Sequence, residues 1–396
     1  MLTNRQLFLL NTAQTSHSPR LIEIDRAEGI YLYGPNGEKY VDLVSGFAVS
    51  NIGHRHPKVL KAITDQLGKY LHVTVYGEFV QAPQVALATK LLAVLPKRFD
   101  TVYFTNSGAE ATEGAMKIAK KFTGRREIIA AHNAYHGSTQ GALSLIGNPE
   151  YHKAYAPLLP EIKFIRYNVP EDLHHITTGT AAVILEAIQG EAGIRVPDVG
   201  YIRAVRKRCD DTGSLLIFDE IQTGFGRTGK LFAFEHYGIE PDILLLAKGM
   251  GGGMPIGAFV ANKAIMDVIK DNPILGHITT FGGHPVSSAA ALASLNVILD
   301  EQLVEDVERK AQLFRRHLQH PAIREIRGKG LMLCLQMDSF SQVARISNYC
   351  AAHGVIIDWF LHCETALRIA PPLTINDEEI AMSCQVILNA LQHEIS

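Results

Sequence analysis

The feature that most restricts the fold of this chain is a series of short apolar runs separated by stretches with helical periodicity. The runs are apolar throughout instead of alternating, which is typical of strands covered on both faces. Helices between such strands predict an α/β fold with a mainly parallel, doubly wound sheet. The predicted strands lie at residues 101–105, 127–131, 163–167, 181–187, 215–220, 243–248 and 258–262.

The pattern is different at the two ends of the chain. Residues 29–43 contain two β-type runs around Asn36-Gly37, a strong signal for a β-hairpin. After about residue 287 two long helices are followed by mixed short strands and helices, and the last helix is capped by Asn376 with Glu379. In the central part, helices are predicted to begin at Pro57 and Pro83, and a third is predicted over 109–122.

These changes of pattern predict three segments. Residues 1–50 form an N-terminal segment with the hairpin, which packs with the small domain. Residues 51–286 form a large domain that binds the cofactor, and residues 287–396 form a small C-terminal α+β domain. No internal repeat or low-complexity linker separates them, so we expect the lobes to be packed firmly together.

Composition excludes several classes of function. The 396 residues are 47% apolar and 20% charged, which excludes disordered and fibrous proteins. The 38 basic and 40 acidic side chains nearly cancel, so no long-range field attracts nucleic acid or an anionic membrane. Five unclustered cysteines indicate reduced thiols, and no stretch approaches the roughly 18 apolar residues of a membrane span. We therefore expect a cytoplasmic protein with no nucleic acid or membrane partner.

Polar residues that directly follow the predicted strands are the first candidates for chemistry, because ligands of open α/β sheets bind beyond the carboxyl ends of strands. Ser107, Gly108 and Ala109 begin a helix directly after one strand, where free N–H groups favour an anion. Taken alone, Ser107 is equally explained as half of a capping box with Glu110.

Two further strand ends carry charged residues. Asp219 follows four apolar residues, and alone it is more often a helix cap or a metal ligand than a cofactor partner. Lys248 ends an apolar run and precedes a glycine-rich turn. Partial desolvation there lowers the pKa of the amine and makes it a nucleophile, which is the chemistry of a Schiff-base lysine.

Together with the aromatic Tyr135, these strand ends form the set needed to hold pyridoxal phosphate. The helix start suits the phosphate, the aromatic suits a ring face, the carboxylate keeps a pyridine nitrogen protonated, and the lysine forms an imine. His132 and His136 are four residues apart but lack the glutamate of a zinc motif, so no metal site is expected.

From the hairpin at residue 30 to residues 370–375, the sequence resembles the class III, or ornithine-type, aminotransferases of the fold type I pyridoxal-phosphate enzymes. The resemblance is densest over residues 184–258, which contain QGEAG, LLIFDEIQTGFGRTGKLF and ILLLAKGMGGG. It implies a large domain with a doubly wound sheet and a smaller α+β domain.

The resemblance also implies roles for individual residues. Lys248 and Asp219 are the implied catalytic residues: Lys248 binds the cofactor and moves the proton, and Asp219 pairs with the pyridine nitrogen. The implied cofactor-binding set further contains Ile221 opposite Tyr135 on the ring, Gln222 on the 3-oxygen, His136, and Ser107, Gly108 and Ala109 on the phosphate. Thr280 matches a threonine that reaches the phosphate of the neighbouring subunit, which implies a homodimer with shared active sites.

Substrate residues are implied in the same way. Arg368 matches the arginine that binds the carboxylate of the 2-oxo acid, and Glu191 matches the glutamate that pairs with this arginine when a terminal amine is bound. Two positions depart from the ornithine pattern: Ser138 stands where an arginine is usual, and Phe47 stands where ornithine transaminases have a tyrosine.

The expected function is transfer of a terminal (ω) amino group from an ornithine- or acetylornithine-like donor to 2-oxoglutarate. Because of Ser138 and Phe47, putrescine or another diamine is an alternative donor, as is 4-aminobutyrate. A pyridoxal-phosphate aminomutase or amino-acid racemase is an alternative of another class, since such enzymes share Asp219 and Lys248. The Glu191–Arg368 pair favours the transaminase, because an isomerase with one substrate has less use for a gate.

Overall fold

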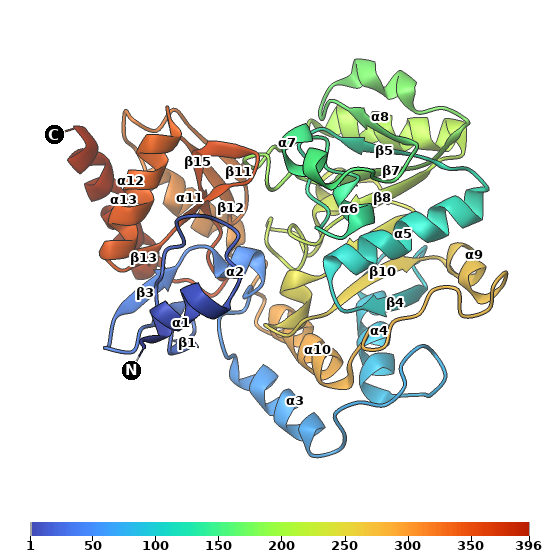
Figure 1. Cartoon of the computed structure of the whole chain (residues 1–396), viewed down its shortest axis with the longest axis horizontal. Helices are drawn as coiled ribbons and strands as arrows, with labels where there is room; N and C mark the ends of the chain where they lie inside the picture. The colour runs from blue at the N-terminus through green and yellow to red at the C-terminus, as the bar shows by residue number, and fades with distance from the viewer. Residues whose placement is uncertain (1, 396) are drawn as a thin grey trace.

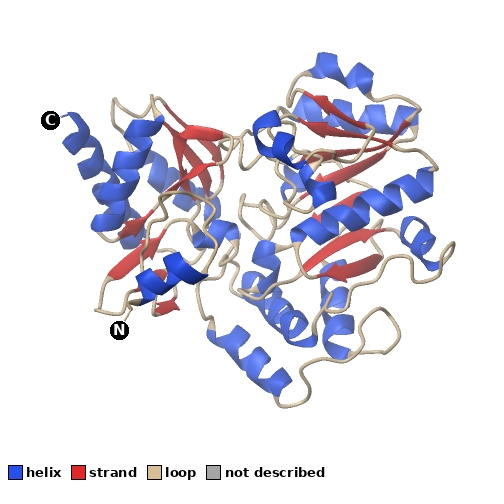
Figure 2. Cartoon of the chain, viewed as in Figure 1, coloured by secondary structure: helices blue, strands red, loops and turns tan. Residues whose placement is uncertain are grey.

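The computed structural model describes residues 2–395, which form a large and a small lobe (Figure 1, Figure 2). The large lobe contains a seven-stranded sheet of order β4-β10-β9-β8-β7-β5-β6. The strands β5, β6, β7, β8 and β9 are parallel, and β10 runs antiparallel to β4 and β9. Their bounds are β4 (Thr101–Thr105), β5 (Glu127–Ala131), β6 (Ile162–Ile165), β7 (Thr180–Glu186), β8 (Leu215–Asp219), β9 (Ile243–Leu246) and β10 (Gly257–Ala261).

The prediction of a mainly parallel sheet covered on both faces is confirmed. Along β7, Val183 and Leu185 belong to one buried cluster, whereas Ala182 and Ile184 belong to another. Since successive side chains of a strand point to opposite faces, the two clusters lie on the two sides of the sheet. One includes residues of α4 (Ala82–Ala93), α8 (Val199–Thr212) and α10 (Pro285–Asp300), and the other includes α5 (Gly108–Thr123).

The end of β9 differs from the prediction at Lys248. The predicted strand 243–248 stops at Leu246, and Lys248 begins a short 3₁₀ helix, Lys248–Gly251. Lys248 has a φ of +47°, which is costly for a residue with a Cβ and takes the chain out of the extended conformation. The lysine is therefore presented from a turn beyond the strand.

The small lobe combines both ends of the chain. One four-stranded sheet has the order β1-β2-β3-β13, and the predicted hairpin is its antiparallel β2/β3 pair. Strand β13 pairs with β3 in parallel. The second sheet has the order β11-β12-β15-β14. The bounds are β1 (Arg26–Glu28), β2 (Tyr31–Tyr33), β3 (Lys39–Asp42), β11 (Glu325–Lys329), β12 (Met332–Gln336), β13 (Val355–Ile356), β14 (Asp358–Phe360) and β15 (Cys363–Ile369).

The remaining helices agree well with the predicted starts and caps. Helix α3 (Pro57–Leu67) begins at the predicted proline, and the last helix, α13, has reciprocal Asn376 and Glu379 capping bonds of 2.9 Å. None of the helices within residues 2–395 has the length and apolarity needed to cross a lipid bilayer. The other α-helices are α1 (Asn4–Asn11), α2 (Ser45–Ala48), α6 (Gln140–Leu143), α7 (Pro149–His152), α9 (Lys263–Met266), α11 (Val307–His317), α12 (Phe340–Ala352) and α13 (Asp377–Ile395).

The packing of α10 indicates where the boundary between the large and the small domain lies. Leu295 and Ile298 of this helix lie in the same buried cluster as Leu87 and Leu91 of α4. Ile30 and Val41 of the N-terminal segment instead pack with the C-terminal residues. We therefore propose that the large domain extends through α10, and that the N-terminal segment belongs with the small domain.

Arg227 joins the lobes at their contact. Its side chain is completely buried and donates to Asn51 Oδ1 at 2.6 Å, to the Leu331 carbonyl at 3.0 Å, and to the Pro371 carbonyl. Burial lowers the pKa of this guanidinium to about 9. Because its partners come from three separate parts of the chain, Arg227 fixes the small lobe against the large one.

Candidate active site

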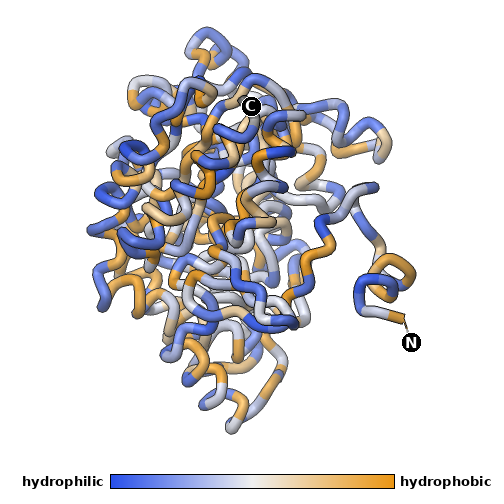
Figure 3. Tube along the Cα trace, turned by 90° about the vertical axis from the view of Figure 1, so that its left-hand side faces the viewer, coloured by the Kyte–Doolittle hydropathy of each residue, from blue (hydrophilic) through white to orange (hydrophobic). Residues whose placement is uncertain are grey.

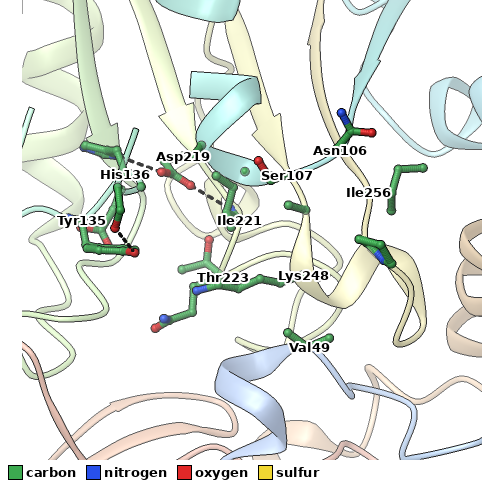
Figure 4. A pocket seen from close by; sticks show the side chains of 18 of the residues that line it. Val49, Asn106, Ser107, Tyr135, His136, Asp219, Ile221, Thr223, Lys248 and Ile256 are labelled. Carbon is green, nitrogen blue, oxygen red and sulfur yellow. Dashed lines mark hydrogen bonds and ion pairs between the residues drawn. The ribbon is translucent and has the colours of Figure 1, made fainter. Parts of the chain in front are cut away.

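A cavity of about 490 Å³ lies beyond the carboxyl ends of the central strands (Figure 4). Most of the residues named from the sequence line this one cavity: Ser107, Gly108, Ala109, Tyr135, His136, Ser138, Glu191, Asp219, Ile221, Gln222 and Lys248. They come from different strand ends and loops, which meet at this edge because β4, β5, β7, β8 and β9 all run in the same direction. Phe47, Thr280 and Arg368 are not among the lining residues.

One end of the cavity is formed by the start of α5. Ser107 caps the helix, with its Oγ accepting from the Glu110 N–H at 3.2 Å, and Glu110 accepts in turn from the Asn106 N–H at 2.8 Å. Capping leaves the N–H groups of Gly108 and Ala109 without an intrahelical acceptor. A Cβ on Gly108 would lie 2.6 Å from Ile221 Cδ1, so only glycine lets Ile221 approach the helix start. Ser107 is therefore the N-cap of α5, and its role at a phosphate stays a prediction.

Asp219 lines the cavity together with a buried histidine. Its Oδ2 lies 2.7 Å from His136 Nδ1, and its Oδ1 accepts from the Ile221 N–H at 2.9 Å (Figure 4). Burial disfavours the charged imidazole, but the bond and charge of Asp219 prevail and raise the pKa of His136. His136 Nε2 is buried with no hydrogen-bond partner among the described residues. The two hydrogen bonds fix the Asp219 carboxylate at the cavity wall.

Lys248 approaches from the end of β9. The ammonium is largely desolvated, and this burial lowers the pKa of Lys248, although the nearby carboxylate of Glu191 opposes the shift. A lowered pKa leaves more of the amine unprotonated near neutral pH, so it can act as a nucleophile or accept a proton.

Glu191 and Arg368 form a short ion pair at the edge of the cavity. Arg368 Nη2 donates to Glu191 Oε2 at 2.6 Å, and Gln222 Nε2 donates to Glu191 Oε1 at 3.1 Å. Burial disfavours the carboxylate, but Arg368 outweighs this effect and lowers the pKa of Glu191 to about 2. Nε and Nη1 of Arg368 are buried and have no partner among residues 2–395. Arg368 therefore keeps donors available for a further anion.

Two aromatic rings hold the guanidinium of Arg368. The Cζ atom lies 4.9 Å from the centre of the Phe47 ring and 4.6 Å from that of Phe360, within cation–π range. Phe47 reaches this place from a turn in which residues 45–48 all have φ between +52° and +64°. This contact is not evident from the sequence, because left-handed backbone is unfavourable for residues with a Cβ.

The structure places the other predicted residues as follows. Ser138 Oγ lies 3.1 Å from Tyr135 OH, so both face the cavity from the loop after β5. Gln222 contacts Glu191, and its predicted contact with a ring oxygen stays a prediction. Thr280 is exposed in the segment that leads to α10, away from the cavity of its own chain.

Sequence reasoning missed one charged lining residue, Glu186, at the end of β7. The signal was present, since an acid at the end of an otherwise apolar strand is unusual. Asn106, Thr223 and Val49 also line the cavity and were not predicted.

These residues fit pyridoxal phosphate. Ile221 lies close to Gly108 at the helix start and donates its N–H to Asp219, and all three residues line the cavity. A phosphate suits the free N–H groups, a protonated ring nitrogen suits Asp219, and an aldehyde suits the amine of Lys248.

Known proteins resemble this chain over most of its length. The model of the family "Aminotransferase class-III" matches residues 12–391. The acetylornithine aminotransferase of Methanocaldococcus jannaschii is 42% identical over 378 residues, covering 92% of this chain and 91% of that protein. That of Caldanaerobacter subterraneus subsp. tengcongensis is 39% identical over 404 residues, covering 99% of both.

Solved structures agree as well. The ornithine aminotransferase from Toxoplasma gondii ME49 has a TM-score of 0.92 at 30% identity, covering 99% of this chain and 96% of that chain. A transaminase from the marine bacterium Virgibacillus has a TM-score of 0.93 at 26% identity, covering 99% of both. The fold type I architecture and the transaminase prediction are confirmed. The chain therefore belongs to the class III aminotransferase family and is a pyridoxal-phosphate-dependent transaminase.

Proposed function

We propose that this transaminase moves a terminal amino group from an ornithine- or acetylornithine-like donor to 2-oxoglutarate. The observation that carries the proposal is the Glu191–Arg368 ion pair of 2.6 Å at the edge of the Lys248 cavity. A single cavity that must accept a terminal amine and then a carboxylate needs a positive charge that is neutralised while the amine is bound and available when the carboxylate enters. The relatives named acetylornithine and ornithine aminotransferase support this choice of donor.

The cofactor is held by residues with distinct tasks. When bound, pyridoxal phosphate supplies an electrophilic carbon for the amine and a ring that accepts the electron pair left by proton removal. The N–H groups of Gly108 and Ala109, with Ser107, hold the phosphate, and Asp219 keeps the ring nitrogen protonated. Ile221 and Tyr135 confine the two ring faces. Lys248 holds the cofactor through its amine and, once that amine is free, moves a proton at the donor carbon.

Glu191 and Arg368 distinguish the two substrates. While a terminal amine occupies the cavity, the Glu191 carboxylate neutralises the Arg368 guanidinium, so no unpaired positive charge repels the donor. When the 2-oxo acid enters, its carboxylate takes the place of Glu191 on Arg368 Nη2 and gains the free donors of the same guanidinium. The displaced carboxylate of Glu191 keeps its bond from Gln222.

A diamine such as putrescine is a second candidate donor. Ser138 gives the cavity no cation near Tyr135, and Phe47 offers no hydrogen bond to a polar donor end. The cavity side of Tyr135 therefore favours a donor without a second carboxylate. 4-Aminobutyrate is the remaining alternative, since its one carboxylate would use Arg368.

The donor is tested by the half-reaction. The purified holoenzyme is mixed with single amines in the absence of any 2-oxo acid, and the visible absorbance of the bound cofactor is followed. We expect loss of that absorbance with ornithine or acetylornithine, and its return on addition of 2-oxoglutarate. Loss with putrescine alone would favour the second candidate, and no loss with any amine would contradict the proposal.

Replacing Arg368 with alanine is expected to raise the KM for 2-oxoglutarate roughly 100-fold, because a charge-assisted bidentate contact is lost. The KM for an amine donor should change much less. Steady-state kinetics with each substrate varied provides the measurement, and Arg316→Ala, which replaces an exposed arginine of α11 outside the cavity, provides the control. An equal loss for both substrates would argue against the assigned role.

We further propose that the enzyme is a homodimer with shared active sites. Large apolar side chains are exposed at the segments around Thr280 and on α1, and Figure 3 shows α1 standing apart from the rest of the chain. Thr280 itself lies outside the cavity of its own chain, as expected if it serves the partner. The exposed residues are Leu2, Leu7, Phe8, Leu9, Leu10, Leu71, Val73, Phe79, Val80, Ile274, Leu275, Ile278 and Phe281.

Mixing two inactive variants tests the shared site. Lys248→Ala lacks the amine, and Thr280→Asp sets a negative charge against the partner's phosphate. Subunit exchange should restore about a quarter of the wild-type activity, because half of the dimers are hybrids with one intact site each. Activity that stays absent in verified hybrids would show that Thr280 does not serve the partner's site, and full activity of Thr280→Asp alone would place Thr280 outside the site. A cytoplasmic location is also proposed, supported by five cysteines that form no disulfide.

A further inference from the structure

Glu186 is a buried carboxylate that has no role yet in binding the cofactor or the substrates. It ends β7, is 6% exposed, and lines the cavity. Both of its oxygens accept main-chain N–H groups: Oε1 from Tyr135 at 3.1 Å and Oε2 from Gly190 at 2.8 Å. No lysine or arginine within residues 2–395 forms an ion pair with it. A buried carboxylate that is held only by N–H groups is costly to keep, which makes it a candidate for a functional role.

The two N–H groups belong to elements that act on different parts of the site. Tyr135 is the aromatic residue that confines one face of the ring. Gly190 belongs to the gate loop, residues 189–195, which also carries Glu191. Reciprocal main-chain hydrogen bonds between Gln189 and Arg195 close this loop. A Cβ on Gly190 would lie 2.2 Å from Gln222 Oε1, so the loop is also pressed against the residue that contacts Glu191. One carboxylate therefore ties the ring-confining residue to the gate.

Burial and the charged groups near Glu186 determine how readily its carboxyl takes up a proton. In the register of the large sheet it is the direct neighbour of Asp219, and His136 is bonded to that aspartate. The charge of Lys248 also acts across the cavity, and Tyr167 OH donates to the main chain of Glu186 at 2.9 Å. Burial, opposed by His136 and reinforced by Asp219, raises the pKa of Glu186 to about 7.

We propose that Glu186 is a positioning residue that fixes the gate loop against Tyr135, and that protonation of its carboxyl releases one of these ties and weakens binding of the 2-oxo acid. A carboxylate has two acceptor oxygens for the two N–H groups. A protonated carboxyl keeps one good acceptor and turns the other oxygen into a donor, which faces an N–H. Either Tyr135 or Gly190 then lacks a partner, and Glu191 and Arg368 lose their fixed relation to the ring. This inference rests on the proposed carboxylate-binding role of Arg368.

Glu186→Gln tests the proposal, because glutamine has the same shape but only one acceptor oxygen at every pH. For the wild-type holoenzyme, the KM for 2-oxoglutarate should rise as the pH falls through about 7, where Glu186 takes up its proton. The Gln variant should have a KM raised about 10-fold above neutrality, where the wild-type carboxylate is ionised, and this KM should no longer vary over that range. A purely structural role for Glu186 would change stability or kcat without removing the pH dependence of KM.

Glu220→Gln is the matched control. Glu220 is also completely buried, its pKa is also raised to about 7 by burial, and it accepts from the Ala233 and Phe234 N–H groups, but it does not line the cavity. This variant should retain the wild-type pH dependence of KM, even if its melting temperature falls.

Arg368→Gln separates failure of the inference from failure of the proposed function. If Arg368→Gln impairs 2-oxoglutarate use while Glu186→Gln leaves the KM and its pH dependence unchanged, the positioning role is wrong and the function stands. If Arg368→Gln has no effect on 2-oxoglutarate use, the proposed function fails first. Loss of the pH dependence in Glu220→Gln as well would assign the effect to general burial and overturn the role of Glu186.

Discussion

Replacing Lys248 with alanine is expected to reduce turnover by at least about 10⁴-fold, because one side chain provides both the covalent attachment and the proton transfer. The cofactor should still bind, though more weakly, since the start of α5 and Asp219 are unchanged. Single-turnover kinetics and the visible absorbance of the bound cofactor measure the two effects separately.

The fold should tolerate this change. Lys248 makes no hydrogen bond or ion pair among those found within residues 2–395, and its desolvated amine contributes a cost rather than a contact. We expect a melting temperature close to that of the wild type. Lys230→Ala, an exposed lysine of the same lobe, is the control and should retain full activity. Turnover by Lys248→Ala near the wild-type rate would overturn the assignment of the active site.

Asp219→Asn is expected to lower kcat by roughly 10²- to 10³-fold, because an amide cannot keep a ring nitrogen protonated as a buried carboxylate does. The substitution keeps the size of the side chain and one acceptor oxygen. The pKa of His136 should fall, since the bond and charge of Asp219 are what raise it against burial. Titration of the imidazole by NMR checks this direction independently of activity.

Glu220→Gln is again the suitable comparison, because it removes a buried carboxylate one residue further along the chain. A comparable fall in kcat for both variants would indicate that burial of charge, and not contact with the ring nitrogen, accounts for the loss. A fall confined to Asp219→Asn would support its assigned role.

The sequence by itself predicted the elements of the large lobe and many of the residues of the cavity. Apolar runs can be read as covered strands because burial on both faces excludes polar residues, and caps such as Asn376 are visible because they depend on neighbouring residues alone. The positions of Ser107, Asp219 and Lys248 followed from the same logic, since the carboxyl ends of parallel strands meet at one edge.

Only the tertiary structure decided how distant parts of the chain meet. Arg368 and Glu191 are 177 positions apart, and their contact was expected only from the family resemblance, because nothing local to either residue requires it. The placement of Phe47 over Arg368 depends on left-handed backbone that sequence propensity opposes, and the pairing of β13 with β3 joins the two ends of the chain. In the sequence Glu186 is only the last residue of an apolar strand. The fold shows that its carboxylate accepts hydrogen bonds from the N–H groups of Tyr135 and Gly190. Local patterns report propensity and burial, whereas these contacts arise from the packing of whole elements, which no single stretch of sequence contains.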